Sequence, residues 1–428
     1  MKIEALYNIF KNHRIISTDT RKISHGDLYF ALKGDNFNGN RFAQEALEKG
    51  AAYAIIDEED FNISDRYILV DNVLETIQRL ANYHRKQFDI PIIGITGTNG
   101  KTTTKEFINV LLRKNYKTTF TKGNLNNHIG VPLTLLSMAD DSEMAIIEMG
   151  ANHIGEIDFL CKISEPNYGI ITNIGTAHIE GFGSLEGVQQ TKNELYQFIQ
   201  SVNGEIFVNS DDPILMSLSN QINRHTYGKS HADCSGKLLS STPSVQLEWK
   251  NESIISNLYG SYNFENIMAA ICIANYFEVS STNIKIAIEE YQSTNNRSQI
   301  IKIDTNVIFL DAYNANPTSM NAAINTFSEN ESNNRLMILG DMLELGNISN
   351  KTHQEIVNKV EKLNINTLFI GNEFNAIENK YDFTYLENVE KAIDWLKHSG
   401  LIDYQILIKG SRGIHLEGIV TYLENKGN

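Results

Sequence analysis

The chain is poor in cysteine, proline and tryptophan, and it lacks any long apolar run. Its 428 residues include three cysteines, six prolines and two tryptophans. Cys161, Cys234 and Cys272 lie far apart, without the paired spacing of a zinc site or a disulfide framework, so we expect free thiols. No stretch approaches the roughly 20 apolar residues of a membrane-spanning helix. The first residues also lack the apolar core of a signal peptide, and we therefore predict a cytoplasmic protein without a membrane span.

Positive charge is scarce as well. The 37 Lys and Arg residues stand against 52 Asp and Glu residues, which gives a formal net charge of -15. A protein that binds the phosphate backbone of a nucleic acid needs a basic surface, so this balance argues against nucleic acid as a main partner. Any anionic ligand must then be held locally by backbone N–H groups, a few cationic side chains or metal ions. A small phosphorylated substrate fits this requirement better than a polymer.

The order of the predicted elements indicates an α/β protein with three domains. Residues 1–85 read as a small α/β domain with a strand, helix, strand pattern. In residues 86–298, apolar strands alternate with helices in the rhythm of a parallel sheet, and the stretch 225–258 reads as a small antiparallel addition. Residues 299–428 repeat the strand and helix alternation, which predicts a Rossmann-like unit. Ligands of open parallel sheets collect beyond the carboxyl ends of the strands, so we look for sites there.

The most informative segment is GITGTNGKTTT, residues 94–104, which follows an apolar strand-like run. Gly97 and Gly100 allow backbone N–H groups to lie close to a polyphosphate, and Lys101 can reach the outer phosphates. The hydroxyl of the next residue, Thr102, can ligate magnesium. The strict pattern places a glycine five positions before Gly100, where this chain has Ile95. A glycine turn with an incidental lysine is the structural alternative. The strand before it and the helix after it favour a phosphate-binding loop.

Polar side chains follow the next strands at the same predicted edge of the sheet. Glu148 closes the apolar run MAIIEMG, where its carboxylate and the Thr102 hydroxyl could hold magnesium. His178 follows the next strand, and Lys192 lies on the helix behind it. Taken alone, Glu148 could be a solvated carboxylate, His178 a hydrogen-bonded core residue and Lys192 a solvated helix charge.

The turns of the last unit are also rich in polar groups. They carry Asp311, Tyr313, Asn314 and Asn316 in DAYNANPTSM, Asp341 and Glu344 in GDMLELG, and Lys409, Ser411 and Arg412 in KGSRGIHLE. Asn and Asp favour such turns for local hydrogen bonding, so a purely structural role is the alternative. Each motif is weak alone, but the charged groups beside glycine could hold a carboxylate or a phosphate.

Together these motifs resemble those of the Mur ligases, the ATP-dependent amino acid and peptide ligases of cell-wall precursor synthesis. The resemblance covers essentially the whole chain, and the shifted first glycine is normal in that family. It rests on TGTNGKTTT, GTAHIEGFGS, KNELY, GSYNFENIMAA, Glu148 and Arg297. The stretches NLNNHIGVPLTLL, EMGANHIGEI and DAYNANPTSM are similar to the members that add D-alanyl-D-alanine, whereas third-residue-adding members carry a DYAHTP-like stretch. The family implies a central P-loop ATPase domain, a small amino-terminal α/β domain that binds the UDP substrate, and a carboxyl-terminal Rossmann-like domain.

The resemblance implies an ATP-dependent carbon–nitrogen ligase. ATP would phosphorylate the terminal carboxylate of UDP-N-acetylmuramoyl-tripeptide, and the amine of D-alanyl-D-alanine would attack the acyl phosphate to give the pentapeptide precursor of peptidoglycan. The third domain would close onto the central one and exclude water. We expect a monomer that acts on these small molecules. Two alternatives stay open: another ligase of the superfamily, of the third-residue-adding or folylpolyglutamate type, and a non-catalytic nucleotide-binding switch.

The resemblance also assigns candidate site residues. The catalytic group would be Lys101, Glu148, His178 and Lys192. Two magnesium ions would be held by Thr102, Glu148, His178 and Lys192, the last one carbamylated by carbon dioxide. ATP would contact Gly97, Thr98, Asn99, Gly100, Lys101, Thr102, Thr103, Asn266, Arg297, Asp311 and Asn314. The UDP substrate would meet Asp19, Thr20, Arg21, Asn126 and Asn127. The candidates for D-alanyl-D-alanine are Tyr313, Asn316, Lys409 and Arg412.

Overall fold

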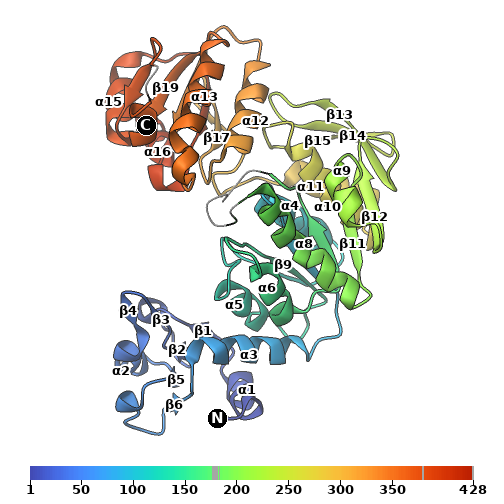
Figure 1. Cartoon of the computed structure of the whole chain (residues 1–428), viewed down its shortest axis with the longest axis vertical. Coiled ribbons are helices and arrows are strands. Elements are labelled where there is room, and N and C mark those ends of the chain that lie inside the picture. Colours follow the sequence, from blue (N-terminus) through green and yellow to red (C-terminus); the bar gives the residue numbers. More distant parts are fainter. Residues whose placement is uncertain (176–181, 183, 378–379, 427–428) are drawn as a thin grey trace.

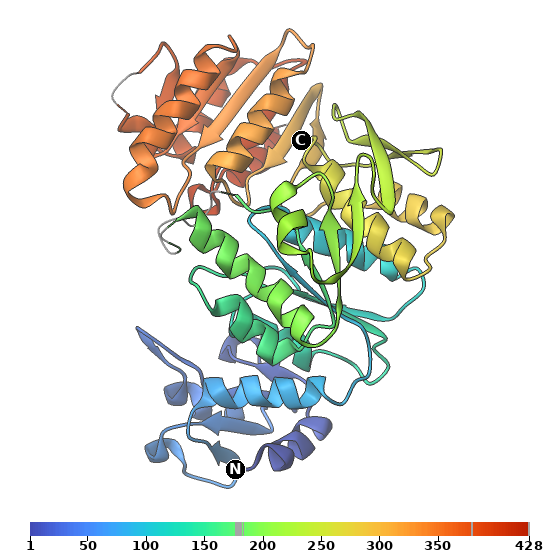
Figure 2. The same cartoon turned by 45° about the vertical axis from the view of Figure 1, so that its right-hand side comes forward.

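The computed structural model describes residues 1–175, 182, 184–377 and 380–426. Three lobes follow one another along its long axis in chain order (Figure 1). The central lobe lies between the other two, and a view turned by 45° keeps the amino-terminal lobe well apart from the carboxyl-terminal one (Figure 2). The predicted three-domain α/β architecture is confirmed.

The amino-terminal lobe is a parallel sheet between helices. Its strand order is β1(Ile16–Ser17), β2(Leu28–Phe30), β5(Tyr53–Ile56) and β6(Tyr67–Leu69), beside a short hairpin of β3(Lys33–Gly34) and β4(Phe37–Asn38). Alternation along β2 sends Leu28 and Phe30 into one core and Tyr29 into another, because successive strand residues face opposite sides. The first core contains residues of α1(Ile3–Asn12) and α3(Val73–Arg85), and the second contains residues of α2(Ala43–Glu48). Helix α3 also packs on the central lobe.

The central lobe is built on one long mixed sheet. Its order is β15(Glu252–Ile255), β14(Gln246–Trp249), β13(Cys234–Ser240), β12(Asn223–Gly228), β11(Glu205–Asn209), β10(Tyr168–Ile171), β7(Ile92–Thr96), β9(Met144–Glu148) and β8(Thr118–Phe120). The strands are parallel from β8 to β13, and β13, β14 and β15 pair antiparallel. The antiparallel addition is therefore smaller than predicted, because β12, which contains His225, extends the parallel sheet along β11.

Helices cover both faces of this sheet. Ile93 and Ile95 of β7 lie in one core with α4(Lys101–Leu112), α10(Asn263–Tyr276) and α11(Ser281–Glu290). Ile92 of the same strand lies in the other core, with α5(Gly130–Leu136), α6(Glu156–Ser164) and α8(Leu185–Ser201). The short α9(Pro213–Leu218) packs on β11. The continuous apolar run of β7 thus reflects burial on both faces, as in other parallel sheets.

The carboxyl-terminal lobe has the predicted Rossmann-like pattern. Its strand order is β16(Gln299–Ile303), β17(Asn306–Asp311), β21(Gln405–Lys409), β18(Arg335–Gly340), β19(Asn366–Ile370) and β20(Thr384–Leu386). All pairs are parallel except β16 with β17. One face packs on α12(Pro317–Ser328), α13(Ser349–Glu361) and α14(Asn372–Asn375), and the other packs on α15(Val389–Ser399) and α16(Glu417–Lys426). Within the described part of the chain, no helix has the length and apolar content that crossing a membrane requires.

Candidate active site

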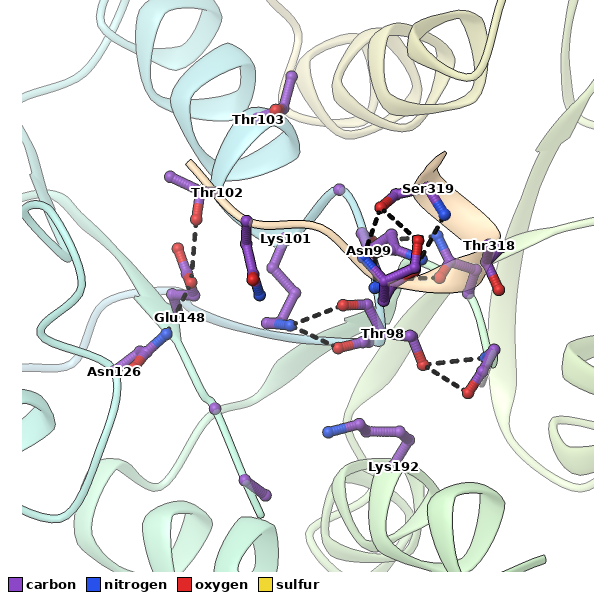
Figure 3. A pocket seen from close by; sticks show the side chains of 18 of the residues that line it. Thr98, Asn99, Lys101, Thr102, Thr103, Asn126, Glu148, Lys192, Thr318 and Ser319 are labelled. Atoms are coloured by element: carbon purple, nitrogen blue, oxygen red, sulfur yellow. Dashed lines mark hydrogen bonds between the residues drawn. The ribbon is translucent and has the colours of Figure 1, made fainter. Parts of the chain in front are cut away.

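A cleft of about 1070 Å³ lies where the central and carboxyl-terminal lobes meet. Its wall combines the loop after β7, the end of β9, the helices α8 and α10, the loops after β17 and β18, and the end of β21. Figure 3 shows part of this wall: Glu148 and Thr102 lie on one side of Lys101, and Ser319 of the third lobe lies on the other side, next to Asn99 of the phosphate loop. The cleft brings together these candidate residues: Gly97, Thr98, Asn99, Gly100, Lys101, Thr102, Thr103, Asn126, Asn127, Glu148, Lys192, Asn266, Arg297, Asp311, Tyr313, Asn314, Asn316 and Lys409.

The phosphate loop requires glycine at two positions. Gly97 has a φ of +143°, and a Cβ there would lie 2.0 Å from the Thr172 Oγ1 atom. Gly100 has a φ of +79°, and its Cβ would lie 2.3 Å from Asn266 Oδ1. Both positions are left-handed and crowded, so any side chain would displace the loop. The loop then leads directly into α4, whose amino-terminal N–H groups face the cleft as an anion site.

The side chain of Lys101 lies over the loop. Its Nζ donates hydrogen bonds to the carbonyl oxygens of Gly97 at 2.7 Å and Thr98 at 3.1 Å (Figure 3). Removal of this ammonium from water lowers its pKa to about 8, and the positive charge of Arg297 acts in the same direction. A bound polyphosphate would offer Lys101 charged oxygen acceptors, which stabilise the ammonium better than neutral carbonyls do.

Glu148 forms the corner of the cleft beside α4. Its Oε1 accepts hydrogen bonds from Thr102 Oγ1 at 3.1 Å and from Asn126 Nδ2 at 2.9 Å. Its Oε2 is buried and has no hydrogen-bond partner among the residues that the structure describes, and the nearest cation, Lys105 Nζ, lies 3.5 Å away. A buried carboxylate with an unfilled oxygen beside a hydroxyl suits a hard cation such as Mg²⁺.

The protein supplies only part of a magnesium coordination shell here. The described residues contain no group of three or more His, Cys, Asp and Glu side chains placed to hold a metal. Thr102 and Glu148 would therefore need phosphate oxygens and water as further ligands, which is the usual arrangement for Mg²⁺ bound with a nucleotide. The residues fit a nucleotide-bound magnesium ion rather than a resident metal.

Lys192 is buried at the base of the cleft. The residue lies on α8 and is 2% exposed, and its Nζ lies 5.2 Å from the centre of the Phe182 ring. This burial excludes the alternative of a solvated helix charge. Burial and the nearby charge of Lys101 lower the pKa of Lys192 to about 7, so a large fraction of its amine is neutral at neutral pH. The predicted partner His178 lies outside the described residues.

An ion pair joins two neighbouring strands of the third lobe at the cleft. Lys409 Nζ donates to Asp311 Oδ2 at 2.7 Å, and the two residues are register partners on β21 and β17. Tyr262, just before α10 of the central lobe, donates its hydroxyl to the same Asp311 oxygen at 3.3 Å. Because the side chain of Lys409 is 1% exposed, its charge neutralises Asp311 rather than facing the cleft freely.

Tyr313 packs against two arginines. The guanidinium of Arg297 lies 3.7 Å from the centre of its ring and that of Arg412 lies 5.3 Å from it. The Nε of Arg297 is buried and has no hydrogen-bond partner within the described part of the chain. A buried donor of this kind is costly unless a ligand satisfies it, and the cleft position favours an anion. Arg412 lies beyond the cleft wall, next to Tyr313.

Other candidate residues have mainly structural contacts. Asn266 Oδ1 accepts from Thr104 Oγ1 at 3.1 Å and its Nδ2 donates to Asn263, so this side chain ties α10 to α4. Asn314 is exposed at the cleft, and its carbonyl lies 3.4 Å from Lys409 Nζ. Asn316 caps α12 through the Ser319 N–H.

The residues predicted to meet the UDP substrate fall into two places. Asp19, Thr20 and Arg21 lie in the amino-terminal lobe, away from the cleft wall, where Asp19 accepts from Arg21 Nη2 at 2.8 Å. The hydrogen bonds from Arg21 lower the pKa of Asp19 to about 2. Asn127 is at the cleft, and its Oδ1 accepts from the Gly130 N–H at 2.9 Å, which places it at the turn into α5.

Three residues that support the cleft were not predicted from the sequence. Asn173 holds the phosphate loop, since its carbonyl accepts the Thr98 N–H and its Oδ1 accepts the Asn99 N–H, both at 3.0 Å. Lys105 is fully buried beside Glu148, and Tyr262 reaches across to Asp311. The signal for Asn173 was its place after an apolar strand next to the phosphate-loop strand.

Comparisons with known proteins match this arrangement over the whole chain. The Mur ligase family, catalytic domain, matches residues 12–93; the Mur ligase middle domain matches residues 95–274; and the Mur ligase, glutamate ligase domain matches residues 296–412. The UDP-N-acetylmuramoyl-tripeptide–D-alanyl-D-alanine ligase of Bacillus subtilis is 34% identical over 95% of this chain and 92% of its own. The chain belongs to the Mur ligase family.

Solved Mur ligase structures share the fold. A crystal structure of MurF from Acinetobacter baumannii matches with a TM-score of 0.86 at 28% identity, covering 99% of this chain and 98% of that one. The MurF ligase of Thermotoga maritima in complex with ADP also matches with a TM-score of 0.86, at 26% identity, covering 97% of this chain and 98% of that one. The Mur ligase cleft described here lies in the part of the fold that these structures share.

Proposed function

We propose that this Mur ligase uses ATP to join D-alanyl-D-alanine to UDP-N-acetylmuramoyl-tripeptide. The relatives that match over nearly the whole chain carry this activity in their names. The observation that carries the proposal is the cleft itself, which places a phosphate loop from the central lobe opposite polar and cationic groups from the third lobe. A ligase needs this composition, because a nucleotide, an acceptor carboxylate and an incoming amine must meet away from water.

The nucleotide would bind along the phosphate loop. Lys101 exchanges its contacts to the Gly97 and Thr98 carbonyls for contacts to the phosphates, and the N–H groups at the start of α4 hold the same oxygens. Thr102 and Glu148 would hold magnesium, which would neutralise phosphate charge when bound. The buried Nε of Arg297 would donate to a phosphate oxygen from the opposite wall.

The reaction then runs in two transfers. The terminal carboxylate of the tripeptide takes the γ-phosphoryl group of ATP, which releases ADP and forms an acyl phosphate. The amine of D-alanyl-D-alanine attacks the acyl carbon, the carbon–oxygen bond to phosphate breaks, and phosphate leaves with its bonding electrons while the amine loses a proton. Lys101 and the loop N–H groups stabilise the charge on the transferring group mainly by position and electrostatics.

Lys192 would carry the carbamate predicted for the family. Only a neutral amine adds to carbon dioxide, and a pKa of about 7 supplies that form at neutral pH. The carbamate carries a negative charge where the ammonium of Lys192 carried a positive one. Its interaction with the nearby ammonium of Lys101 therefore changes from repulsion to attraction. This change supports the proposal that Lys192 organises a second metal site together with His178.

The amino-terminal lobe would bind the uridine diphosphate end of the substrate. Arg21 donates to both carboxylate oxygens of Asp19, which holds its guanidinium in a defined position. The Arg21 side chain is exposed, so it would be accessible to the diphosphate of the substrate. The tripeptide would then extend past Asn127 toward the cleft. The monomeric state and the cytoplasmic location remain predictions.

A coupled assay tests the function. Phosphate release from ATP should require both UDP-N-acetylmuramoyl-tripeptide and D-alanyl-D-alanine. A folylpolyglutamate-type ligase would not need the UDP substrate, and a nucleotide switch would bind ATP without forming a condensed product. Release of phosphate at an unchanged rate without either substrate would contradict the proposal.

A further inference from the structure

The turn that joins the central lobe to the third lobe has an unusual backbone on both sides of Arg297. Asn296 has a φ of +57° and Ser298 a φ of +50°, so both neighbours are left-handed without being glycine. Asparagine enters this region more readily than most residues, whereas serine does so at a higher energetic cost. Such a conformation persists where the surrounding structure enforces it. Contacts from other residues must therefore hold this turn in place.

The side-chain amide of Gln299 holds the first half of the turn. Its Oε1 accepts the Asn296 N–H at 3.0 Å, and its Nε2 donates to the Ser293 carbonyl. One amide thus closes the turn by using both its acceptor and its donor. Gln299 is also the first residue of β16 and is the register partner of Leu310 on β17, so its backbone belongs to the sheet of the third lobe.

The turn is also joined to the loop after β17. The Asn296 carbonyl accepts the N–H groups of Ala312 at 2.9 Å and Tyr313 at 3.2 Å. The centre of the Tyr313 ring lies 3.7 Å from the guanidinium carbon of Arg297. Arg297 is therefore ordered in two ways, by the backbone that precedes it and by the ring on which it stacks, and both depend on the position of Asn296.

Ser298, on the other side of Arg297, is fixed by the central lobe. Its Oγ lies 3.0 Å from the Tyr262 hydroxyl, and its carbonyl accepts the Tyr259 N–H at 3.1 Å. Tyr262 and Ser298 line the cleft themselves, so a substitution at either position would change its wall directly. Gln299 is not among the described residues that line the cleft, and it can be changed without altering that wall.

The orientation of Arg297 matters because its guanidinium is the cation that this turn brings to the cleft. Arg297 lines the cleft, and its buried Nε has no hydrogen-bond partner among the described residues. A guanidinium presents its donors in a fixed planar arrangement, and an anion is bound more tightly when this arrangement is oriented beforehand. A misdirected Arg297 would lose both its ligand contact and the stacking on Tyr313.

We infer that Gln299 is a positioning residue for Arg297, whose guanidinium it keeps directed toward the phosphates of the bound nucleotide. It acts through the Asn296 N–H and the Ser293 carbonyl and touches no substrate. The inference rests on the proposed function and deepens it, because it names a residue outside the cleft wall on which the nucleotide contact depends.

The test measures kcat/KM for ATP in the full chain, with UDP-N-acetylmuramoyl-tripeptide and D-alanyl-D-alanine saturating. Gln299→Met keeps the length of the side chain and removes both hydrogen bonds, and Gln299→Thr removes them with a residue that suits a strand. We expect both variants to lower kcat/KM for ATP about tenfold or more, because a displaced group aligns the phosphates less well, while the KM values for the other two substrates change less than about twofold. Gln292→Met, the same change at an exposed residue of the same linker, is the matched control and should change none of these values.

A double-mutant cycle distinguishes positioning from a general loss of structure. Arg297→Met removes the guanidinium and should itself lower kcat/KM for ATP. If Gln299 acts through Arg297, adding Gln299→Met to Arg297→Met should lower kcat/KM less than about twofold further. A loss by the same factor in both backgrounds would overturn the inference. Circular dichroism melts show which variants are folded, and Gln299→Thr replaces Gln299→Met in the cycle if the latter is not.

The remaining outcomes separate the inference from the function. If wild type forms no product from ATP and the two other substrates, the proposed function fails and the inference falls with it. If wild type is active and Arg297→Met keeps its kcat/KM for ATP, the inference fails while the ligase function stands. If Arg297→Met is impaired and both Gln299 variants match wild type, the inference alone is overturned.

Discussion

Asn316 Nδ2 donates a hydrogen bond to Asn99 Oδ1 at 2.7 Å, which joins the third lobe directly to the phosphate loop. Asn316 is also the amino-terminal cap of α12, where its Oδ1 accepts the Ser319 N–H at 2.9 Å. One amide therefore serves both the stability of a helix and the contact between the two walls of the cleft. The two roles can be separated by substitution.

Asn316→Ser should keep the cap and lose the contact between lobes. Serine caps helices about as well as asparagine, so we expect the free energy of unfolding to change by less than about 0.5 kcal/mol. Its side chain is too short to reach Asn99, so kcat should fall because the cleft closes less readily.

Asn316→Ala should show the same fall in kcat and lose about 1 kcal/mol of stability as well. Urea denaturation and steady-state kinetics measure both. Equal kcat in wild type and Asn316→Ser would contradict a role for this contact in the reaction.

Lys192→Ala should lose most of its activity, roughly 10²-fold or more, if the side chain carries a carbamate that organises the transferring phosphoryl group. Added acetate or formate should restore part of the rate, because a small carboxylate can occupy the space of the carbamate. Chloride at the same ionic strength is the control for a salt effect. Activity that is unaffected by the substitution, or a loss that no carboxylate restores, would count against the carbamate.

The burial of Lys192 also predicts a pH dependence of stability. Its pKa is lowered to about 7 in the folded protein, against about 10.4 in an unfolded chain. Between these values the unfolded state binds more protons, so the stability of wild type should rise with pH relative to Lys192→Met. Below about pH 7 the amine of Lys192 is protonated in both the folded and the unfolded state. The difference in stability between wild type and Lys192→Met should then be constant, at the value least favourable to wild type. Thermal melts of the two proteins from pH 6 to 10, in buffer free of carbon dioxide, measure it. A difference in Tm that does not change over this range would contradict the pKa shift.

Lys105 stabilises two acidic neighbours from a fully buried position. Its Nζ lies 3.1 Å from Glu106 Oε1 and 3.5 Å from Glu148 Oε2. Lys105→Met would leave the buried Glu148 carboxylate without its neighbouring cation, which typically costs about 3–5 kcal/mol, so we expect a loss of about that size in the free energy of unfolding, measured by urea denaturation. Adding Glu106→Gln should recover part of the loss. If Lys105→Met is as stable as wild type, the Glu106 and Glu148 carboxylates do not need the Lys105 charge for the stability of the fold.

The sequence predicted the parts of the site that are local. The phosphate loop could be recognised because a strand, a glycine turn and a helix follow one another within a few residues, and the chemistry of the turn depends on its own backbone. Glu148 could be recognised because it closes an apolar strand. The burial of Lys192 could not be predicted, since it depends on which helix face packs on the sheet. The Asp311–Lys409 pair depends on the register of two strands nearly 100 residues apart, and the sequence alone suggested two separate ligand contacts.

The extent of the antiparallel addition was wrong for a related reason. The prediction rested on polar alternation within the stretch 225–258, but β12, at the start of this stretch, pairs parallel with β11 and packs against α10. β12 lies inside the sheet, where it pairs parallel with both β11 and β13. Alternation of polar and apolar residues therefore does not give the direction of a strand, which depends on the connection before it.

The most direct test of the account is the product itself. Purified protein, ATP, magnesium, UDP-N-acetylmuramoyl-tripeptide and D-alanyl-D-alanine are incubated, and the mixture is analysed by mass spectrometry together with the amount of ADP formed. We predict the UDP-linked pentapeptide in one-to-one ratio with ADP, and neither above background when the dipeptide or the UDP substrate is left out. ADP formed without the pentapeptide, or a pentapeptide formed without ATP, would contradict the central claim.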